Sequence, residues 1–381
     1  MDGRQAGVSA RRRVIKVGTS LLRGGPLRPT AAVIADLAAS LARRRHCGDH
    51  LALVTSGAVG LGCSALALDK RPTELQALQA AAAVGQGHLM ALYQEAFAVR
   101  GLTTAQVLLT RGDLASRRRY QRASRTLEQL LAWGVIPVVN ENDTLATDEL
   151  RFGDNDTLSA LVAVAIAADE LILLTDVDRL YSGDPRVVVA AQPIPEVRDL
   201  AELQQLSHVA GGGGQWGTGG MTTKLTAARI ATASGVRVHL LDGRDPAVLE
   251  ALFAGEAVGT VFQPSPRPLS DRKGWLAHAL LPMGSLRLDA GAERALLRHG
   301  ASLQVVGITA VEGDFERNQP VRLLAGDGRE LGRGLCALAS HELQALVGLQ
   351  PEDRRRRIGE LGGDPGAAVV HRDQLVLTVG S

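Results

Sequence analysis

Short apolar runs alternate with longer stretches of mixed or alanine-rich sequence through the first 262 residues of the chain. Five of these runs have the length and the β-branched or leucine content of buried strands: Val14–Val17, Leu51–Val54, Val107–Leu109, Val135–Val139 and Leu171–Leu174. The intervening stretches are long enough for helices, which we expect at residues 29–45, 72–100, 119–133, 157–168 and 224–234. This alternation predicts an α/β fold, a mostly parallel sheet with helices on both faces.

The pattern changes after residue 262. Residues 263–282 are expected to form a linker, because Gln263–Lys273 is rich in proline and basic residues. Short strands are expected beyond it at 285–288, 301–307, 321–324, 331–338 and 369–373, with a helix at 290–298. Gly326-Asp327-Gly328 has the composition of a hairpin turn. The sequence therefore predicts a first domain at 1–262, the linker at 263–282 and a small β-rich barrel within 283–381.

Two clusters of polar residues stand next to apolar segments in the middle of the first domain. Asn140-Glu141-Asn142-Asp143 follows a predicted strand, and Gly153-Asp154-Asn155-Asp156 precedes a predicted helix, for which Asp154, Asn155 or Asp156 is a candidate N-cap. Ligands bind at this edge of an open α/β sheet. Asn and Asp are also common in ordinary turns, but two clusters this close favour a site that reads the ammonium and carboxylates of a small zwitterion.

Two other predicted strands end in small-residue turns that lead towards helices, at Gly18-Thr19-Ser20 and at Thr55-Ser56-Gly57. Such turns expose backbone N–H groups at a positive helix end, which suits anions. Lys16 would project from the end of its strand towards the same place. The alternative for a lone lysine is a surface side chain that lies along apolar residues.

A glycine-rich segment, Gly211–Lys224, precedes the helix expected at 224–234. Its glycines let the backbone approach a ligand closely, Thr218, Thr222 and Thr223 add hydroxyl donors, and Lys224 can reach phosphate. The alternative is a flexible linker, although linkers do not usually end in an ordered helix start. The spacing matches neither the Walker loop nor the dinucleotide-binding fingerprint.

Charge and cysteine content narrow the class of protein. The net charge is +2, so the chain as a whole has no strong electrostatic attraction to nucleic acid or to membranes. Cys47, Cys63 and Cys336 are far apart and form no metal or disulfide pattern, as expected in a reducing cytosol. The sequence contains neither a signal peptide nor an apolar stretch long enough to span a bilayer, so we expect a cytoplasmic protein.

The order of these motifs resembles that of the glutamate 5-kinases, a branch of the amino acid kinase family, over essentially the whole chain. The similarity is carried by Lys16-Val17-Gly18-Thr19-Ser20, Thr55-Ser56-Gly57-Ala58, the two polar clusters, Thr175-Asp176 and Gly217-Thr218-Gly219-Gly220-Met221 through Lys224. The four-glycine run at Gly211 departs from the pattern. The C-terminal segment resembles the PUA domain that follows the kinase domain in many members.

The resemblance implies a transferase that uses ATP and Mg²⁺ to phosphorylate the γ-carboxylate of L-glutamate, the first step of proline biosynthesis. It implies that Ser56, Asp143 and Asn155 bind glutamate and that Lys16 and Lys224 flank the transferred phosphoryl group. ATP would be bound by Lys16, Thr175, Asp176, Thr218, Gly219, Gly220, Met221, Thr222, Thr223 and Lys224. We assign Asp143 either to the substrate ammonium or to orienting the two lysines; the metal ligands are unknown.

Partners and regulation follow from the resemblance alone: feedback inhibition by proline, a homo-oligomer (dimer or tetramer), and an interaction with the next enzyme of the pathway. Two other functions remain open. One is a related amino acid kinase acting on another carboxylate. The other is RNA binding through the PUA-like segment, which is disfavoured because aromatic residues make up 3% of the chain and Arg354–Arg357 suits a solvated helix face.

Overall fold

The computed structural model describes residues 10–377 apart from 25–27, 111–112, 115–116, 146–154, 187, 200, 204, 207–219, 267, 269–281 and 361–367. The chain folds as two compact units, Met1–Leu269 and Ser270–Ser381. Each has its own sheet and its own apolar core. Within the described residues, no helix is long and apolar enough to cross a membrane.

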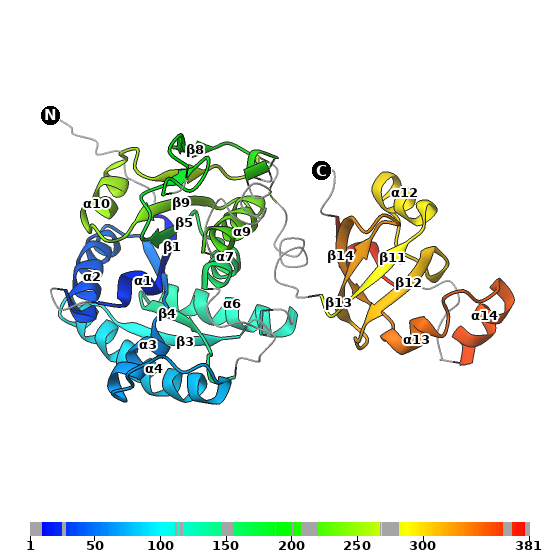
Figure 1. Ribbon diagram of the computed structural model, residues 1–381, viewed down its shortest axis with the longest axis horizontal. Helices are drawn as coiled ribbons and strands as arrows, with labels where there is room; N and C mark the ends of the chain where they lie inside the picture. Colours follow the sequence, from blue (N-terminus) through cyan, green and yellow to red (C-terminus); the bar gives the residue numbers. More distant parts are fainter. Residues whose placement is uncertain are drawn as a thin grey trace. The chain divides into compact units, whose positions relative to one another are not determined.

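One large sheet organises the described part of the first unit (Figure 1). Its order is β3-β4-β2-β1-β5-β9-β10-β8, and neighbouring strands are parallel except for the antiparallel pair β9 and β10. The bounds are β1 Arg12–Val17, β2 His50–Val54, β3 Thr104–Leu109, β4 Ile136–Glu141, β5 Glu170–Thr175, β8 Glu196–Val197, β9 Arg237–Asp242 and β10 Thr260–Phe262. A short antiparallel pair, β6 Leu180–Tyr181 and β7 Pro193–Ile194, lies outside this sheet.

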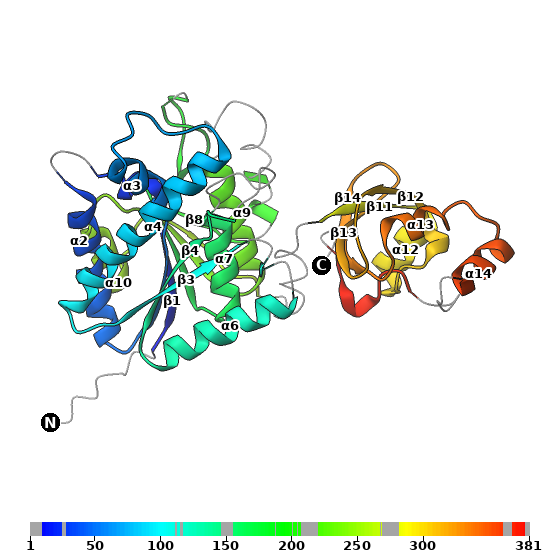
Figure 2. The ribbon, with the colours of Figure 1, turned by 90° about the horizontal axis from the view of Figure 1, so that it is seen from below.

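Helices cover both faces of the sheet, as Figure 2 shows. One face carries α1 Thr19–Leu22, α2 Thr30–His46, α3 Ala58–Ala65, α4 Leu75–Ala98 and α10 Ala247–Ala254. The other carries α6 Arg117–Ala132, α7 Asn155–Ala165 and α9 Gly220–Ala233. Every residue of α7 is buried, because this helix contacts the sheet as well as α6 and α9. Its sequence is accordingly apolar on nearly all sides.

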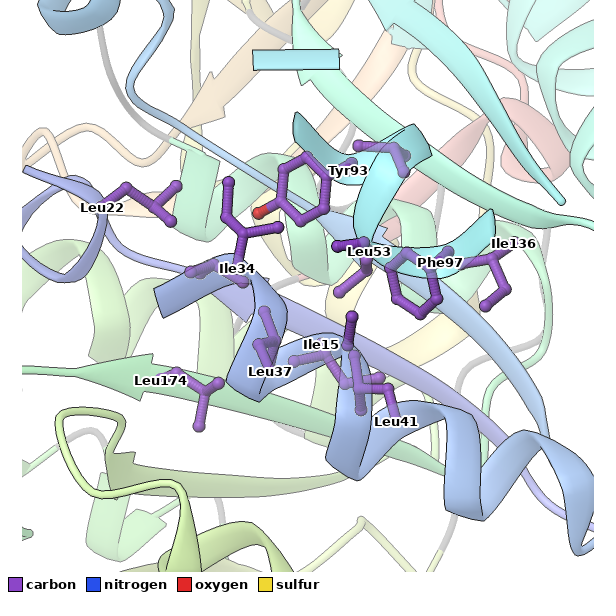
Figure 3. Close-up of a cluster of buried hydrophobic side chains, with 14 of the residues drawn as sticks. Ile15, Leu22, Ile34, Leu37, Leu41, Leu53, Tyr93, Phe97, Ile136 and Leu174 are labelled. Carbon is purple, nitrogen blue, oxygen red and sulfur yellow. The ribbon is translucent and has the colours of Figure 1, made fainter. Parts of the chain in front are cut away.

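The main core lies between the sheet and the helices α2 and α4 (Figure 3). Strand residues such as Ile15 and Leu53 pack with Leu41 of α2 and Phe97 of α4. Tyr93, which is fully buried, shares a hydrogen bond of 2.9 Å between its hydroxyl and Thr55 Oγ1. The core therefore extends without a break to the end of β2, where one of the small-residue turns begins.

Helices α3 and α4 pack backbone against backbone through glycine. A Cβ atom on Gly85 would lie 1.8 Å from the carbonyl oxygen of Ala58, and one on Gly62 would lie 1.7 Å from that of Ala81. Ala58 is the first residue of α3, directly after Gly57, whose φ of +100° is one that glycine adopts without strain. The close approach at Gly85 thus sets the position of the start of α3.

The second unit contains a five-stranded sheet within its described residues, in the order β12-β11-β13-β14-β15. β11 and β13 are parallel, and the other neighbours are antiparallel. The bounds are β11 Gly284–Leu288, β12 Ile308–Gly313, β13 Gln319–Leu324, β14 Glu330–Cys336 and β15 Leu375–Leu377, with helices α12 Ala290–His299, α13 Ser340–Gln344 and α14 Pro351–Glu360. The predicted turn at 326–328 is confirmed, since Ala325 N donates to Arg329 O (2.8 Å).

The five strands predicted in the first unit are confirmed, but several other expectations are wrong. Residues 301–307 are not a strand: Leu303 makes an isolated bridge to Val370, and Val305–Gly307 is a 3-10 helix. The closing strand is Leu375–Leu377 rather than 369–373. Asn155 and Asp156 are the first residues of α7 rather than its cap, and Asp154 lies outside the described residues. Strands β8, β9 and β10 were not predicted.

The glycine contact between α3 and α4 can be tested with two substitutions in one helix. Gly85→Ala should lower the free energy of unfolding by about 1–3 kcal/mol, because backbone must move to admit the methyl group. Gly87→Ala should instead raise it by up to about 1 kcal/mol, because Gly87 faces open space and alanine favours the helix. Chemical denaturation of both variants measures this; equal effects would contradict the packing described here.

Candidate functional site

The candidate site lies at the carboxyl ends of β1, β2, β4 and β5. The chain leaves β1 through Gly18, whose N–H donates to Leu174 O of β5 (3.3 Å), and enters α1. It leaves β2 through Thr55 and Ser56 and enters α3. The first residues of α7 and α9 come to the same place, as their contacts below show. Parallel strands thus bring segments far apart in the sequence to one edge of the sheet.

A buried ion cluster forms the centre of the site. Lys16 Nζ lies 2.7 Å from Asp156 Oδ1, and Lys224 Nζ lies 3.3 Å from Asp156 Oδ2. Thr223 Oγ1 donates to the same Oδ2 atom (2.7 Å), and Lys224 Nζ also donates to Gly220 O (3.1 Å). Burial alone would raise the pKa of Asp156, but the charges of Lys16 and Lys224 and the hydrogen bonds hold it below its usual value. Asp156 is therefore a carboxylate shared by two ammonium groups.

A chain of amides lies beside the ion cluster. Asn155 Nδ2 donates to Thr55 O (2.8 Å), Ser56 Oγ (2.8 Å) and Asn140 Oδ1 (3.1 Å). Asn140 Nδ2 in turn donates to Gln86 Oε1 of α4 (2.8 Å). Asn155 Oδ1 is buried and has no hydrogen-bond partner among the described residues. Such an oxygen is costly to leave unpaired, so it is available to a donor from a ligand.

Asn140 and Asn155 line a pocket of about 560 Å³, which we call the amide pocket. It is also lined by Ser56, by the first turns of α3, and by the charged side chains of Asp143, Arg23 and Arg71. Burial raises the pKa of Asp143 to about 6, and the positive charge of Arg71 opposes part of that rise. Asp143 is therefore ionised at neutral pH and suited to bind a cation.

A second pocket, of about 580 Å³, lies at the end of β5, and we call it the β5 pocket. Thr175, Asp176, Gly220, Met221 and Lys224 are among the residues that line it. Three arginines on its wall are each paired with a nearby aspartate: Arg179 with Asp178 (2.8 Å), Arg186 with Asp184 (2.8 Å) and Arg244 with Asp242 (2.6 Å). These pairs place both positive and negative charge around the β5 pocket.

The ion cluster connects the two pockets. Asn155 lines the amide pocket, the next residue, Asp156, binds both lysines, and Lys224 lines the β5 pocket. Two anionic ligands, one in each pocket, could meet beside these ammonium groups. The arrangement suits transfer of an anionic group between them.

The structure brings most of the predicted residues together. Ser56, Asp143 and Asn155 share the amide pocket, and Thr175, Asp176, Gly220, Met221 and Lys224 share the β5 pocket. Thr222 and Thr223 lie in the first turn of α9, where Thr223 binds Asp156. The predictions for Thr218 and Gly219, and those for the glycine run Gly211–Gly214, lie outside the described residues.

Sequence reasoning missed the part that Asp156 takes. It considered Asp143 for orienting the lysines, but the structure places Asp156 in contact with both of them. It also missed the charged residues Arg23, Arg71, Arg186 and Arg244. The cluster Gly153-Asp154-Asn155-Asp156 was a signal for Asp156. That Asp156 and not Asp143 contacts the lysines depends on how α7 packs against β1 and α9, which the sequence does not show.

Comparisons with known proteins agree on the family. The model of the amino acid kinase family matches residues 11–242, and that of the PUA domain matches residues 284–356. A protein named glutamate 5-kinase from Parasynechococcus marenigrum (strain WH8102) is 62% identical over 96% of this chain and 98% of its own length. Proteins of the same name from Prochlorococcus marinus (strain MIT 9313) and Acaryochloris marina (strain MBIC 11017) are 60% and 52% identical, each over 96% of this chain and 98% of its own length.

The shared carboxylate should be important for stability. Asp156→Asn leaves one buried and one partly buried ammonium group without their counter-charge, so the free energy of unfolding should fall by about 3–5 kcal/mol. Asp176→Asn, at an exposed position on the same edge of the sheet, should change it by less than about 0.5 kcal/mol. Denaturation curves of both variants test this, and an Asp156→Asn protein as stable as the wild type would show that the cluster is not held as described.

Proposed function

Because the chain belongs to the amino acid kinase family, we propose that it is a glutamate 5-kinase, which uses ATP to phosphorylate the γ-carboxylate of L-glutamate. The observation that carries this proposal is the Lys16–Asp156–Lys224 cluster between the two pockets. One pocket suits a small zwitterion, and the other, with Lys224 and the start of α9 in its lining, suits a polyanion. The product, L-glutamyl 5-phosphate, is an acyl phosphate, the activated acid with which proline synthesis begins.

Glutamate is assigned to the amide pocket. Its ammonium group would bind the carboxylate of Asp143, and its polar atoms would bind Ser56 and the amide of Asn155. The γ-carboxylate would then point towards the ion cluster, since Asn155 and Asp156 are adjacent. Pockets lined by a few fixed polar groups orient small ligands in this way.

ATP is assigned to the β5 pocket, with its phosphates towards Lys224 and the N-terminal turn of α9. Backbone N–H groups at the start of a helix favour phosphate, and Gly220, which has no side chain, allows close approach there. Thr175 and Asp176 also line this pocket. The same assignment extends to Thr218 and Gly219 from the family pattern alone.

Mg²⁺ is part of the proposal as the partner of ATP. Within the described residues, no group of three or more His, Cys, Asp or Glu side chains could hold a metal ion by itself. Kinases usually hold Mg²⁺ with one or two carboxylates and the nucleotide phosphates. Asp176 offers one carboxylate in the β5 pocket, which fits such an ion held mainly by the nucleotide. When bound, Mg²⁺ supplies positive charge at the phosphates.

The chemistry needs positioning and charge rather than a general base. The γ-carboxylate of glutamate has a reference pKa near ~4.3, so it is already an ionised nucleophile at neutral pH. One of its oxygens forms a bond to the γ-phosphorus of ATP, the bond from that phosphorus to the oxygen bridging it to the β-phosphate breaks, and ADP leaves with that oxygen. Lys16 and Lys224 offset the repulsion between the two anions, and Asp156 keeps the two ammonium groups apart and in place.

Regulation and partners stay predictions. They comprise inhibition by proline at the amide pocket, a dimer or tetramer, a contact with the next enzyme of the pathway, and a cytoplasmic location. RNA binding by the PUA domain remains disfavoured. On α14, Arg356 pairs with Asp353 (2.8 Å) and Arg357 with Glu360 (2.7 Å), which supports a solvated face over a phosphate-binding one.

The direct test is glutamate-dependent ATP turnover by the purified chain with Mg²⁺, with the acyl phosphate trapped by hydroxylamine. We expect hydroxamate with L-glutamate and none when glutamate or Mg²⁺ is left out. Hydroxamate or ADP formed with aspartate, acetylglutamate or carbamate instead of glutamate would assign the chain to a related amino acid kinase.

Lys224→Ala should lower kcat by about 10²–10³-fold, the usual effect of removing one donor that stabilises charge in the transition state. The KM for glutamate should change little, because Lys224 lines the β5 pocket and not the amide pocket. Lys16→Ala should behave similarly. Lys70→Ala, an exposed lysine that lines neither pocket, is the control. Unchanged turnover by Lys224→Ala would contradict the mechanism.

The pKa of Asp143 predicts a pH dependence. Since only the ionised carboxylate attracts the ammonium group, kcat/KM for glutamate should fall about tenfold per pH unit below about 6, where Asp143 becomes protonated. Asp143→Asn should have a much lower kcat/KM, and it should lose this fall at low pH, the acidic limb of the profile. A limb that begins only near the pKa of glutamate itself, about 4.3, would count against Asp143.

A further inference from the structure

The proposed substrate carries a carboxylate and an ammonium group on the same carbon atom. A site that binds both by charge must therefore present a carboxylate and a cation next to each other. The γ-carboxylate needs a separate set of positive charges, which Lys16 and Lys224 supply. The cation for the α-carboxylate has to come from elsewhere in the amide pocket.

Among the described residues that line the amide pocket, Asp143 is the acid, and Arg23 and Arg71 are the cations. Asp143 follows β4, Arg71 lies in the loop between α3 and α4, and Arg23 is the C-cap of α1. The two arginines thus approach the pocket from different segments. Either one could in principle meet an anion there.

Arg71 and Asp143 line the same pocket, and Arg71 is the arginine whose charge acts on the Asp143 carboxyl group. Arg23 makes no comparable contribution to the pKa of Asp143. Arg71 is exposed and precedes Pro72, whose ring restricts the backbone of Arg71 to extended conformations. Its guanidinium can therefore meet an incoming carboxylate at the pocket without first leaving the protein interior.

We propose that Arg71 is a specificity-determining residue that binds the α-carboxylate of the amino acid, next to Asp143, which binds its α-ammonium. The inference rests on the proposed function and adds the reason why the pocket would select α-amino acids. A guanidinium offers two parallel N–H donors that match a carboxylate. The Asp143–Arg71 pair is thus complementary to the two charges on the substrate's α-carbon.

The test compares L-glutamate with 4-aminobutyrate, which is glutamate without its α-carboxylate. Arg71→Gln should lower kcat/KM for glutamate by about tenfold or more, as expected for the loss of a charged hydrogen bond. It should leave kcat/KM for 4-aminobutyrate nearly unchanged. Where 4-aminobutyrate turns over too slowly to measure, its inhibition constant against glutamate should stay nearly the same instead. The KM for ATP should also stay the same, because Arg71 does not line the β5 pocket.

A pH profile provides a second readout that a purely structural role would not move. Removing the positive charge beside Asp143 should shift the acidic limb of kcat/KM for glutamate to higher pH. Arg71→Lys keeps the charge, so its limb should remain near that of the wild type. Arg23→Gln is the matched control from the same pocket and should preserve both the substrate preference and the limb.

An Arg71→Gln enzyme that keeps the wild-type preference for glutamate, or an Arg23→Gln enzyme that loses it, would overturn the inference. Failure of the proposed function looks different, because the wild-type enzyme would then form no glutamate-dependent hydroxamate. Thermal unfolding of each variant confirms that the comparison is made between folded enzymes.

Discussion

The contact on which the site depends is the one between the Asp156 carboxylate and two ammonium groups. Lys16 comes from a strand in the middle of the sheet, Asp156 from the first turn of α7, and Lys224 from the second turn of α9. Two positive charges this close would repel each other strongly in a buried place. One shared carboxylate removes most of that repulsion and still leaves the cluster with a net charge of +1. That remaining charge is what an anionic phosphoryl group can use.

Packing on the other face of the sheet holds the amide pocket in place. The fully buried Tyr93 reaches Thr55 at the end of β2, and Gln86 reaches Asn140 at the end of β4. Both come from α4, the helix that also fixes the start of α3 through its glycine contact. The long helix α4 therefore supports the pocket from behind, while α1, α3 and the strand ends supply most of its lining. Its polar groups are held by an apolar core that takes no part in the chemistry.

The second unit has its own apolar core and its own sheet, separate from those of the first unit. Its residues 284–356 match the PUA domain. Strand pairing within it does not follow chain order, since β11 lies between β12 and β13. Its last strand was predicted in the wrong place for a different, local reason. A short apolar run such as Val369-Val370 reads as a strand, but in the structure it supplies a single bridge to Leu303 before the chain reaches β15.

The amino-acid sequence by itself determined the alternation of strands and helices in the first unit and the polar residues at the strand ends. These features are local: a β-branched run, a glycine turn or an Asn–Asp cluster acts on its own neighbours. β9 escaped prediction because Arg237 and His239 interrupt its apolar pattern, although His239 is buried in the sheet. Only the tertiary structure decided that Asp156 rather than Asp143 binds the lysines, and that Arg71 and Asp143 line the same pocket. Those contacts join residues far apart along the chain, and no local pattern specifies which strand ends and helix starts will meet.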